Sequence, residues 1–164
     1  FRHTAANLTP EDWEFLRALP KTRQFGDVVL CHGTPSSDLV YLPETIESGR
    51  LREGTDAEVA GRLVGVAARL VICGHTHFPR VLLLEDGRTV VNPGSVGLAA
   101  YEGEGVPHVM ACGSPHARYA VFERADHGWQ VEHRAIAYDW HAAADFAARL
   151  GRHEWERWLR WGRV

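Results

Sequence analysis

The chain has 164 residues, of which 45% are apolar and 24% charged, and its formal net charge is -3. This composition is typical of a globular domain and excludes a disordered chain. The acidic balance gives no clear nucleic-acid surface, and no apolar run reaches the roughly 18 residues that a membrane span needs. Three cysteines, odd in number and far apart, argue against a disulfide scaffold. Without an export signal at the start, they favour a cytoplasmic location.

The first third of the sequence predicts one helix, two short strands and a long loop. Thr9-Pro10 is typical of a helix start, because a hydroxyl N-cap precedes proline at the first helical position. We expect strands at 22–25 and 28–31, the second ending in His32-Gly33. Residues 36–54 show no convincing period and predict a long ordered loop. The apolar residues of the helix, expected to be buried, are Trp13, Leu16 and Leu19.

The middle of the sequence predicts a helix, a buried strand and a hairpin. A capping-box pattern opens a helix over about 55–68. A buried strand is expected at 69–73, and it ends in Gly74-His75-Thr76-His77. Asp86-Gly87 is a strong turn signal and predicts a hairpin over 80–91.

The last third predicts a loop, a second hairpin and two helices. Residues 99–115 are rich in glycine and proline and are expected to form an exposed loop. A hairpin is expected over 118–137, followed by helices at about 140–150 and 153–161. Strands that alternate with helices and then form hairpins predict an α/β fold with mixed β-sheets flanked by helices.

Three histidines directly follow predicted buried strands and are the candidate metal ligands. His75 and His77 are two residues apart, so in extended backbone both side chains leave on the same side. Two such imidazoles can chelate one metal ion or bind two adjacent ions. His32 stands at the equivalent position of another strand. A lone His-x-His pattern also occurs in surface loops, but this second strand-end histidine favours a metal site.

These motifs resemble the calcineurin-like metallophosphoesterases, and among them the small bacterial phosphodiesterases. The resemblance rests on Gly74-His75-Thr76-His77, on the preceding Cys31-His32-Gly33 and on the following Asn92-Pro93-Gly94-Ser95-Val96-Gly97. It implies a β-sandwich with outer helices. It also implies two divalent metal ions, with His32 and His75 binding one and His77 the other. The implied activity is hydrolysis of small phosphate esters by a hydroxide that bridges the two ions. Imidazole with carboxylate suits Mn, Fe, Zn or Ni.

The family's Asp-x-His, Gly-Asp and Gly-Asn-His motifs do not occur in residues 1–164. Three neutral imidazoles cannot balance two divalent ions, so the site needs carboxylates as well. We therefore expect residues 1–164 to be the C-terminal part of a single metallophosphoesterase domain, whose N-terminal half carries those motifs and the proton-donating histidine. The segment alone, with no catalytic residue of its own, should be inactive.

Two alternative functions remain open at this point. A non-catalytic binding module could use the same scaffold, and a His-x-His metal hydrolase of the amidohydrolase type could place the motif on a TIM barrel. The barrel needs about 250 residues. Candidate substrate contacts are Ser95, Asp38 and Tyr41, with Glu44 on the same loop as the last two.

The other reactive or aromatic side chains have simpler structural interpretations. Cys31 and Cys73 could form a thiolate site, but small core residues at strand ends are commoner. His133 lies on an apolar strand face and is interpreted as a core residue. A helical stripe of tryptophans predicts core packing or a homo-oligomer contact: Trp155, Trp158 and Trp161. Five further histidines have no partner at ligand spacing: His108, His116, His127, His141 and His153.

Overall fold

The computed structural model describes residues 2–103 and 105–164 and contains a central mixed sheet. The order across this sheet is β1 (Thr22–Phe25), β2 (Val28–Cys31), β5 (Leu70–Ile72), β7 (Thr89–Asn92) and β6 (Arg80–Leu83). The three inner strands β2, β5 and β7 are parallel, whereas β1 and β6 pair antiparallel at the two edges. The predicted α/β fold with a mixed sheet is therefore confirmed, and it is an open sheet rather than a TIM barrel.

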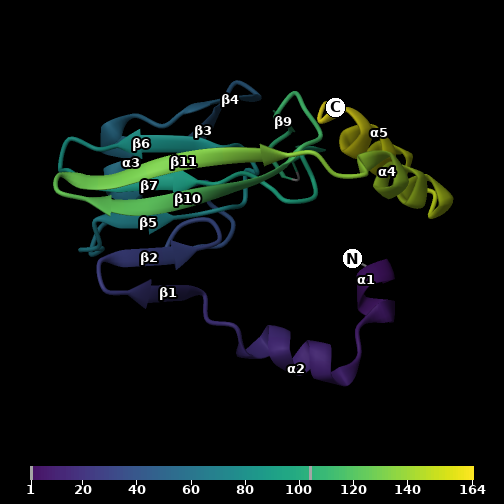
Figure 1. Cartoon of the computed structure of the whole chain (residues 1–164), viewed down its shortest axis with the longest axis horizontal. Helices are drawn as coiled ribbons and strands as arrows, with labels where there is room; N and C mark the ends of the chain where they lie inside the picture. The colour runs from purple at the N-terminus through teal and green to yellow at the C-terminus, as the bar shows by residue number, and fades with distance from the viewer. Residues whose placement is uncertain (1, 104) are drawn as a thin grey trace.

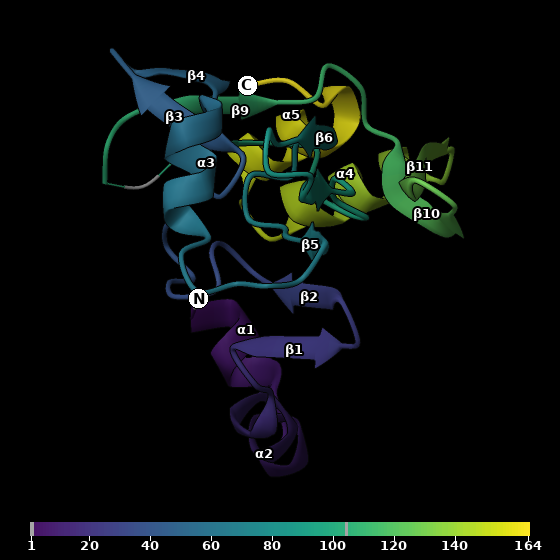
Figure 2. The same cartoon turned by 90° about the vertical axis from the view of Figure 1, so that its left-hand side faces the viewer.

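The two faces of the central sheet are covered by different elements (Figure 2). On one face lies α3 (Asp56–Arg62), which begins at the predicted capping box of Thr55 and Glu58. The helix is shorter than the expected 55–68, and the chain continues past it in a turn. On the other face lies the hairpin of β10 (Ala117–Ala125) and β11 (Gly128–Ile136). The inner strand β7 is accordingly buried along all four residues, as expected of a parallel strand covered on both faces. The edge strand β1 is exposed throughout.

The hydrophobic core lies between the sheet and α3. Val59 and Leu63, which are almost fully buried, come from α3 and its C-cap, and they belong to one cluster with Val71 and Val90 of the inner strands. On the opposite face, His133 of β11 donates from Nε2 to the Asn92 carbonyl at 2.9 Å. His133 is half-buried and hydrogen-bonded, consistent with its interpretation as a structural residue.

Two short hairpins occupy segments that we expected to be loops. Residues 36–54 contain β3 (Glu44–Glu47) and β4 (Arg50–Glu53), and residues 99–115 contain β8 (Ala100–Glu102) and β9 (Val109–Ala111). Both loop predictions were wrong for the same reason. Glu44 and Ala100 occupy fully buried positions of these strands, and neither is a large apolar residue. No apolar alternation therefore marks these strands.

The N-terminal helices α1 (Arg2–Asn7) and α2 (Pro10–Ala18) project away from the sheet (Figure 1). The predicted start of α2 is confirmed, since Thr9 and Asp12 form a reciprocal capping box. The predicted burial of its apolar side is wrong. None of the α2 residues is buried, and Leu16 and Leu19 are 43% and 53% exposed. Helix capping is a local interaction and forms without a partner surface, whereas burial needs one.

Two C-terminal helices, α4 (Trp140–Arg149) and α5 (His153–Trp161), pack against each other at the end of the chain. Of the tryptophan stripe on α5, Trp158 is buried while Trp161 is 59% exposed. Among the described residues, no helix is long and apolar enough to cross a membrane.

We expect Leu63→Ala to lower the free energy of unfolding by about 2–5 kcal/mol, because truncation leaves a cavity in the core. The neighbouring Val64 is 84% exposed, so Val64→Ala should change the same quantity by about 0.5 kcal/mol or less. Urea unfolding of the two variants measures the difference. Equal effects would contradict the assignment of Leu63 to the core.

Candidate metal centre

The carboxyl ends of two adjacent parallel strands bring His32 and His75 together. His32 directly follows β2, and His75 follows β5 after Cys73 and Gly74. The two imidazole centroids are 4.8 Å apart. The Gly74 amide donates to the His32 carbonyl at 2.8 Å, which ties the two strand ends to each other. In open α/β sheets, ligands bind at this carboxyl edge.

The segment Gly74-His75-Thr76-His77 is a turn and not the extended backbone that we expected. His75 and His77 have φ values of 68° and 59°, in the left-handed region. Non-glycine residues adopt this region at a cost, so surrounding contacts must hold them there. Thr76, between them, is fully buried. The two imidazoles therefore come from a turn whose middle residue, Thr76, is buried, and not from an extended strand.

Asn92, the last residue of β7, holds this turn in place. Its Nδ2 donates to the Gly74 carbonyl at 2.6 Å and to the Thr76 hydroxyl at 2.8 Å, and its Oδ1 accepts from the Gly94 amide at 2.9 Å. Asn92 is fully buried. One side chain thus connects the Asn-Pro-Gly turn to the histidine turn.

His77 is oriented by its surroundings. Its Nδ1 donates to the Leu98 carbonyl at 2.8 Å, and its ring lies 5.1 Å from that of Tyr101. Because the carbonyl can only accept, the proton sits on Nδ1 and leaves Nε2 free as a donor atom for a metal. Metal-ligating histidines are commonly oriented in this way.

Burial lowers the pKa of His75 and of His77 below the ordinary value of 6.5. For His75, the neighbouring His32 lowers it further; for His77, the hydrogen bond to Leu98 opposes the shift. Both rings are therefore neutral at pH 7, which is the form that binds metal ions.

The donor chemistry fits a divalent metal ion, but only as part of a ligand set. Within residues 2–103 and 105–164, no group of three or more histidine, cysteine or acidic side chains could hold one ion. His32 and His75 converge, and His77 lies on the same turn with its own orientation. Further ligands are needed to complete a site.

A hydrogen-bonded cluster that the sequence did not reveal lies against His75. The Tyr41 ring is 4.7 Å from the His75 ring, and its hydroxyl lies 3.0 Å from the Tyr101 hydroxyl and 2.8 Å from Nε2 of His108. Tyr101 in turn donates to the His75 carbonyl at 3.0 Å. His108 is buried, and its Nδ1 donates to the Val106 carbonyl at 2.7 Å. The two partners Tyr41 and His108 are far apart in sequence, so ligand-spacing arguments could not connect them.

The other two predicted substrate contacts lie in turns near the histidines. The Ser95 hydroxyl accepts from the amides of Gly97 and Leu98 at 3.3 and 3.1 Å, as expected of a residue that supports its own turn. Asp38 lies in the loop after β2, and its charge contributes to raising the pKa of Cys31.

The cysteines at the strand ends behave as core residues. Cys73 is buried and its thiol donates to the Val91 carbonyl at 3.6 Å, while the Cys31 thiol donates to the Gly33 carbonyl at 3.4 Å. Burial, with a smaller contribution from Asp38, raises the pKa of Cys31 to about 11. A thiolate site is therefore disfavoured.

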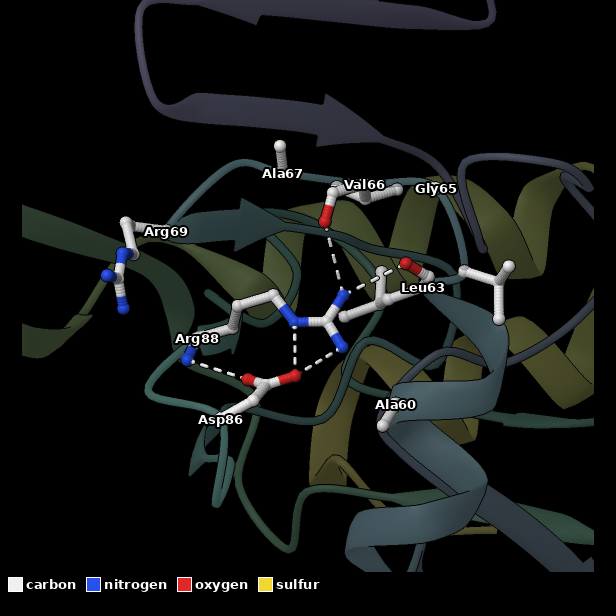
Figure 3. A pocket seen from close by; sticks show the side chains of 9 residues that line it. Ala60, Leu63, Gly65, Val66, Ala67, Arg69, Asp86 and Arg88 are labelled. Carbon is white, nitrogen blue, oxygen red and sulfur yellow. Dashed lines mark hydrogen bonds and ion pairs between the residues drawn. The ribbon is translucent and has the colours of Figure 1, made fainter.

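A separate cavity of about 640 Å³ lies at the opposite edge of the sheet (Figure 3). It is formed by the end of α3 and by residues just before β5 and β7. The Arg88 guanidinium in this cavity donates hydrogen bonds to the Asp86 carboxylate and to the carbonyls of Leu63 and Val66. This cavity adjoins the amino ends of the parallel strands and not the histidines.

Comparison with solved structures places this geometry in a known fold. The crystal structure of a metallophosphoesterase from Sphaerobacter thermophilus matches with a TM-score of 0.70 and 22% sequence identity, over 96% of this chain. The chain has the metallophosphoesterase fold. It spans 63% of the length of the Sphaerobacter protein.

Weaker structural matches are forms of Vps29 from Entamoeba histolytica. A single mutant matches with a TM-score of 0.40 and 17% identity, over 80% of this chain and 79% of that one. The wild type complexed with Zn²⁺ matches with a TM-score of 0.36 and 16% identity, over 77% and 76% of the two chains. No family model matches the sequence, and no curated protein matches it either.

We expect Asn92→Ala to lower the free energy of unfolding by about 1–3 kcal/mol, because it leaves the buried Gly74 carbonyl without its partner. His133→Ala, which removes one half-buried hydrogen bond to Asn92, should have a smaller effect of about 1 kcal/mol. Denaturant unfolding compares the two. A smaller effect for Asn92→Ala than for His133→Ala would contradict the role of Asn92 in holding the turn.

Cys31 should resist alkylation in the folded protein. A pKa of about 11 in place of 9.0 reduces the thiolate fraction near about pH 8 by roughly a hundredfold. The measurement is the rate of iodoacetamide labelling of Cys31 by peptide mass spectrometry, in buffer and in concentrated urea. Labelling at the unfolded rate in buffer would reinstate the thiolate interpretation.

Proposed function

We propose that the protein containing this chain hydrolyses small phosphate esters, with divalent metal ions that His32, His75 and His77 help to hold. The observation that carries the proposal is the meeting of His32 and His75, whose ring centroids are 4.8 Å apart at the carboxyl edge of the sheet. The fold that the chain shares with a metallophosphoesterase supports the same function.

Each of the three histidines has a defined part in the proposal. His32 and His75 would share one ion, and His77, with Nδ1 held by Leu98, would bind a second ion through Nε2. Bound divalent ions supply charge neutralisation on the phosphoryl oxygens and activate water near neutral pH. Asn92 and Tyr101 would position the turn, since both form hydrogen bonds to its backbone.

The proposal requires carboxylate ligands in addition to these imidazoles. Two divalent ions carry more charge than neutral histidines can balance. The chain spans 63% of the length of the Sphaerobacter metallophosphoesterase. We therefore include in the proposal that another part of the protein supplies carboxylates and the proton-donating histidine. The metals would come from the group Mn, Fe, Zn and Ni, and the location would be cytoplasmic.

In the full-length protein, His75→Ala and His77→Ala should each remove most phosphodiesterase activity and lower the bound metal content, with a change in the free energy of unfolding of no more than about 1 kcal/mol. Both residues lie after β5 and outside the core cluster, so truncation leaves a polar gap rather than a core cavity. His153→Ala is the matched control, because its side chain is 77% exposed on α5.

The measurement is turnover per folded molecule on bis(p-nitrophenyl) phosphate, with metal content determined alongside. His153→Ala should retain normal turnover. Near-normal turnover and metal content in His77→Ala would refute the two-metal proposal, whatever the effect of His75→Ala.

A further inference from the structure

A cavity of about 850 Å³ begins at the candidate metal centre and extends to the C-terminal helix. His75 and His77 line it at one side, and Arg152, Trp155 and Trp158 of the α5 region line it at another. A volume of this size is typical of sites that enclose most of a small organic ligand. The cavity is therefore much larger than a phosphate group needs.

The lining of this cavity is mainly apolar and aromatic. Its aliphatic members come from the loop before β3, from β3 itself and from the loops around β8: Leu39, Val40, Ile46, Leu98 and Val106. Its aromatic members include Tyr41, Tyr101 and Trp155. The Arg152 guanidinium lies over the Trp155 ring at 4.8 Å, which restricts the motion of that ring. Flat aromatic walls of this kind favour a flat ring as occupant.

Among the residues that the structure describes, two buried polar atoms of lining residues have no hydrogen-bond partner. They are Oε2 of Glu44 and Nε1 of Trp158. The Glu44 side chain is fully buried, and its Oε1 accepts from Arg80 at 2.8 Å. Trp158 is only 6% exposed. Because both atoms are closed off from the cavity as well as from solvent, they do not select its occupant. The occupant is selected by the apolar and aromatic side chains that the cavity exposes.

We propose that this cavity binds the alcohol component of the phosphate ester, and that this component carries a flat aromatic ring. The inference rests on the proposed function, because it places the phosphate at the histidines. The ring would lie against Trp155 and Tyr41, which line the cavity. Simple alkyl phosphates would leave the cavity largely empty.

Phenylphosphonate and methylphosphonate test this proposal. Both present the same charged phosphonate, neither has an ester bond to hydrolyse, and only one carries a ring. Calorimetric titration of the Mn²⁺-loaded full-length protein should show phenylphosphonate binding at least about tenfold more tightly, equivalent to about 1.4 kcal/mol. Trp155→Ala should reduce this ratio to about threefold or less, and Trp155→Phe should restore most of it.

Trp161→Ala is the matched control. Trp161 lies on the same helix, is exposed and lines a different cavity with Trp140 and Arg157, so this variant should keep the wild-type ratio. Leu39→Ser is a second test variant. Leu39 is 85% exposed, so the substitution should not disturb folding, and it should also lower the ratio.

The outcomes separate this inference from the proposed function. If the full-length protein hydrolyses bis(p-nitrophenyl) phosphate but binds the two phosphonates with equal affinity, the cavity assignment is overturned and the proposed hydrolase function is supported. Tight, Trp155-dependent binding of phenylphosphonate without hydrolysis would support the ring site and overturn the catalytic proposal. A wild-type preference that Trp155→Ala and Leu39→Ser both leave unchanged would also overturn the cavity assignment.

Discussion

The arrangement of the candidate metal centre depends on the side chain of Asn92. Its Nδ2 forms hydrogen bonds to the Gly74 carbonyl and to the Thr76 hydroxyl, and the main-chain carbonyl of Asn92 accepts from His133 on the covering hairpin. These bonds hold two non-glycine residues, His75 and His77, in left-handed backbone conformations. Such conformations persist only where the surrounding structure fixes them. A single buried amide thereby fixes the turn that carries both imidazoles to the edge of the sheet.

A second constraint is the buried carboxylate of Glu44. It pairs with Arg80 of β6, which also pairs with Glu53 of β4, and so joins the small β3–β4 hairpin to the central sheet. Burial raises the pKa of Glu44, and the Arg80 guanidinium opposes that shift. Buried ion pairs seldom add much net stability, because desolvation offsets the Coulombic attraction. Their value here is positional, since the same loop carries Tyr41 to the ring of His75.

The candidate metal centre and the cavity beside it use different physical properties of one loop region. The histidine turn provides neutral nitrogen donors, because burial lowers the pKa of both imidazoles. The cavity provides apolar and aromatic surface. A phosphate ester combines these demands, since a charged group is joined to an organic one. The metallophosphoesterase fold positions both at the carboxyl edge of the parallel strands.

The sequence by itself determined the helix starts, the tight turn and the buried strand, because residues close together in the chain specify them. The capping boxes at Thr9 and Thr55, the hairpin at Asp86-Gly87 and the strand that ends at His32 could all be predicted, because caps, turns and apolar runs act between near neighbours. The three histidines were recognised for the same reason, since each lies at or shortly after the end of a strand. Only the tertiary structure decided the rest. The β3–β4 and β8–β9 hairpins, the left-handed turn at His75 and the contact between Tyr41 and His108 depend on burial and on partners distant in sequence, and neither can be seen in a local pattern.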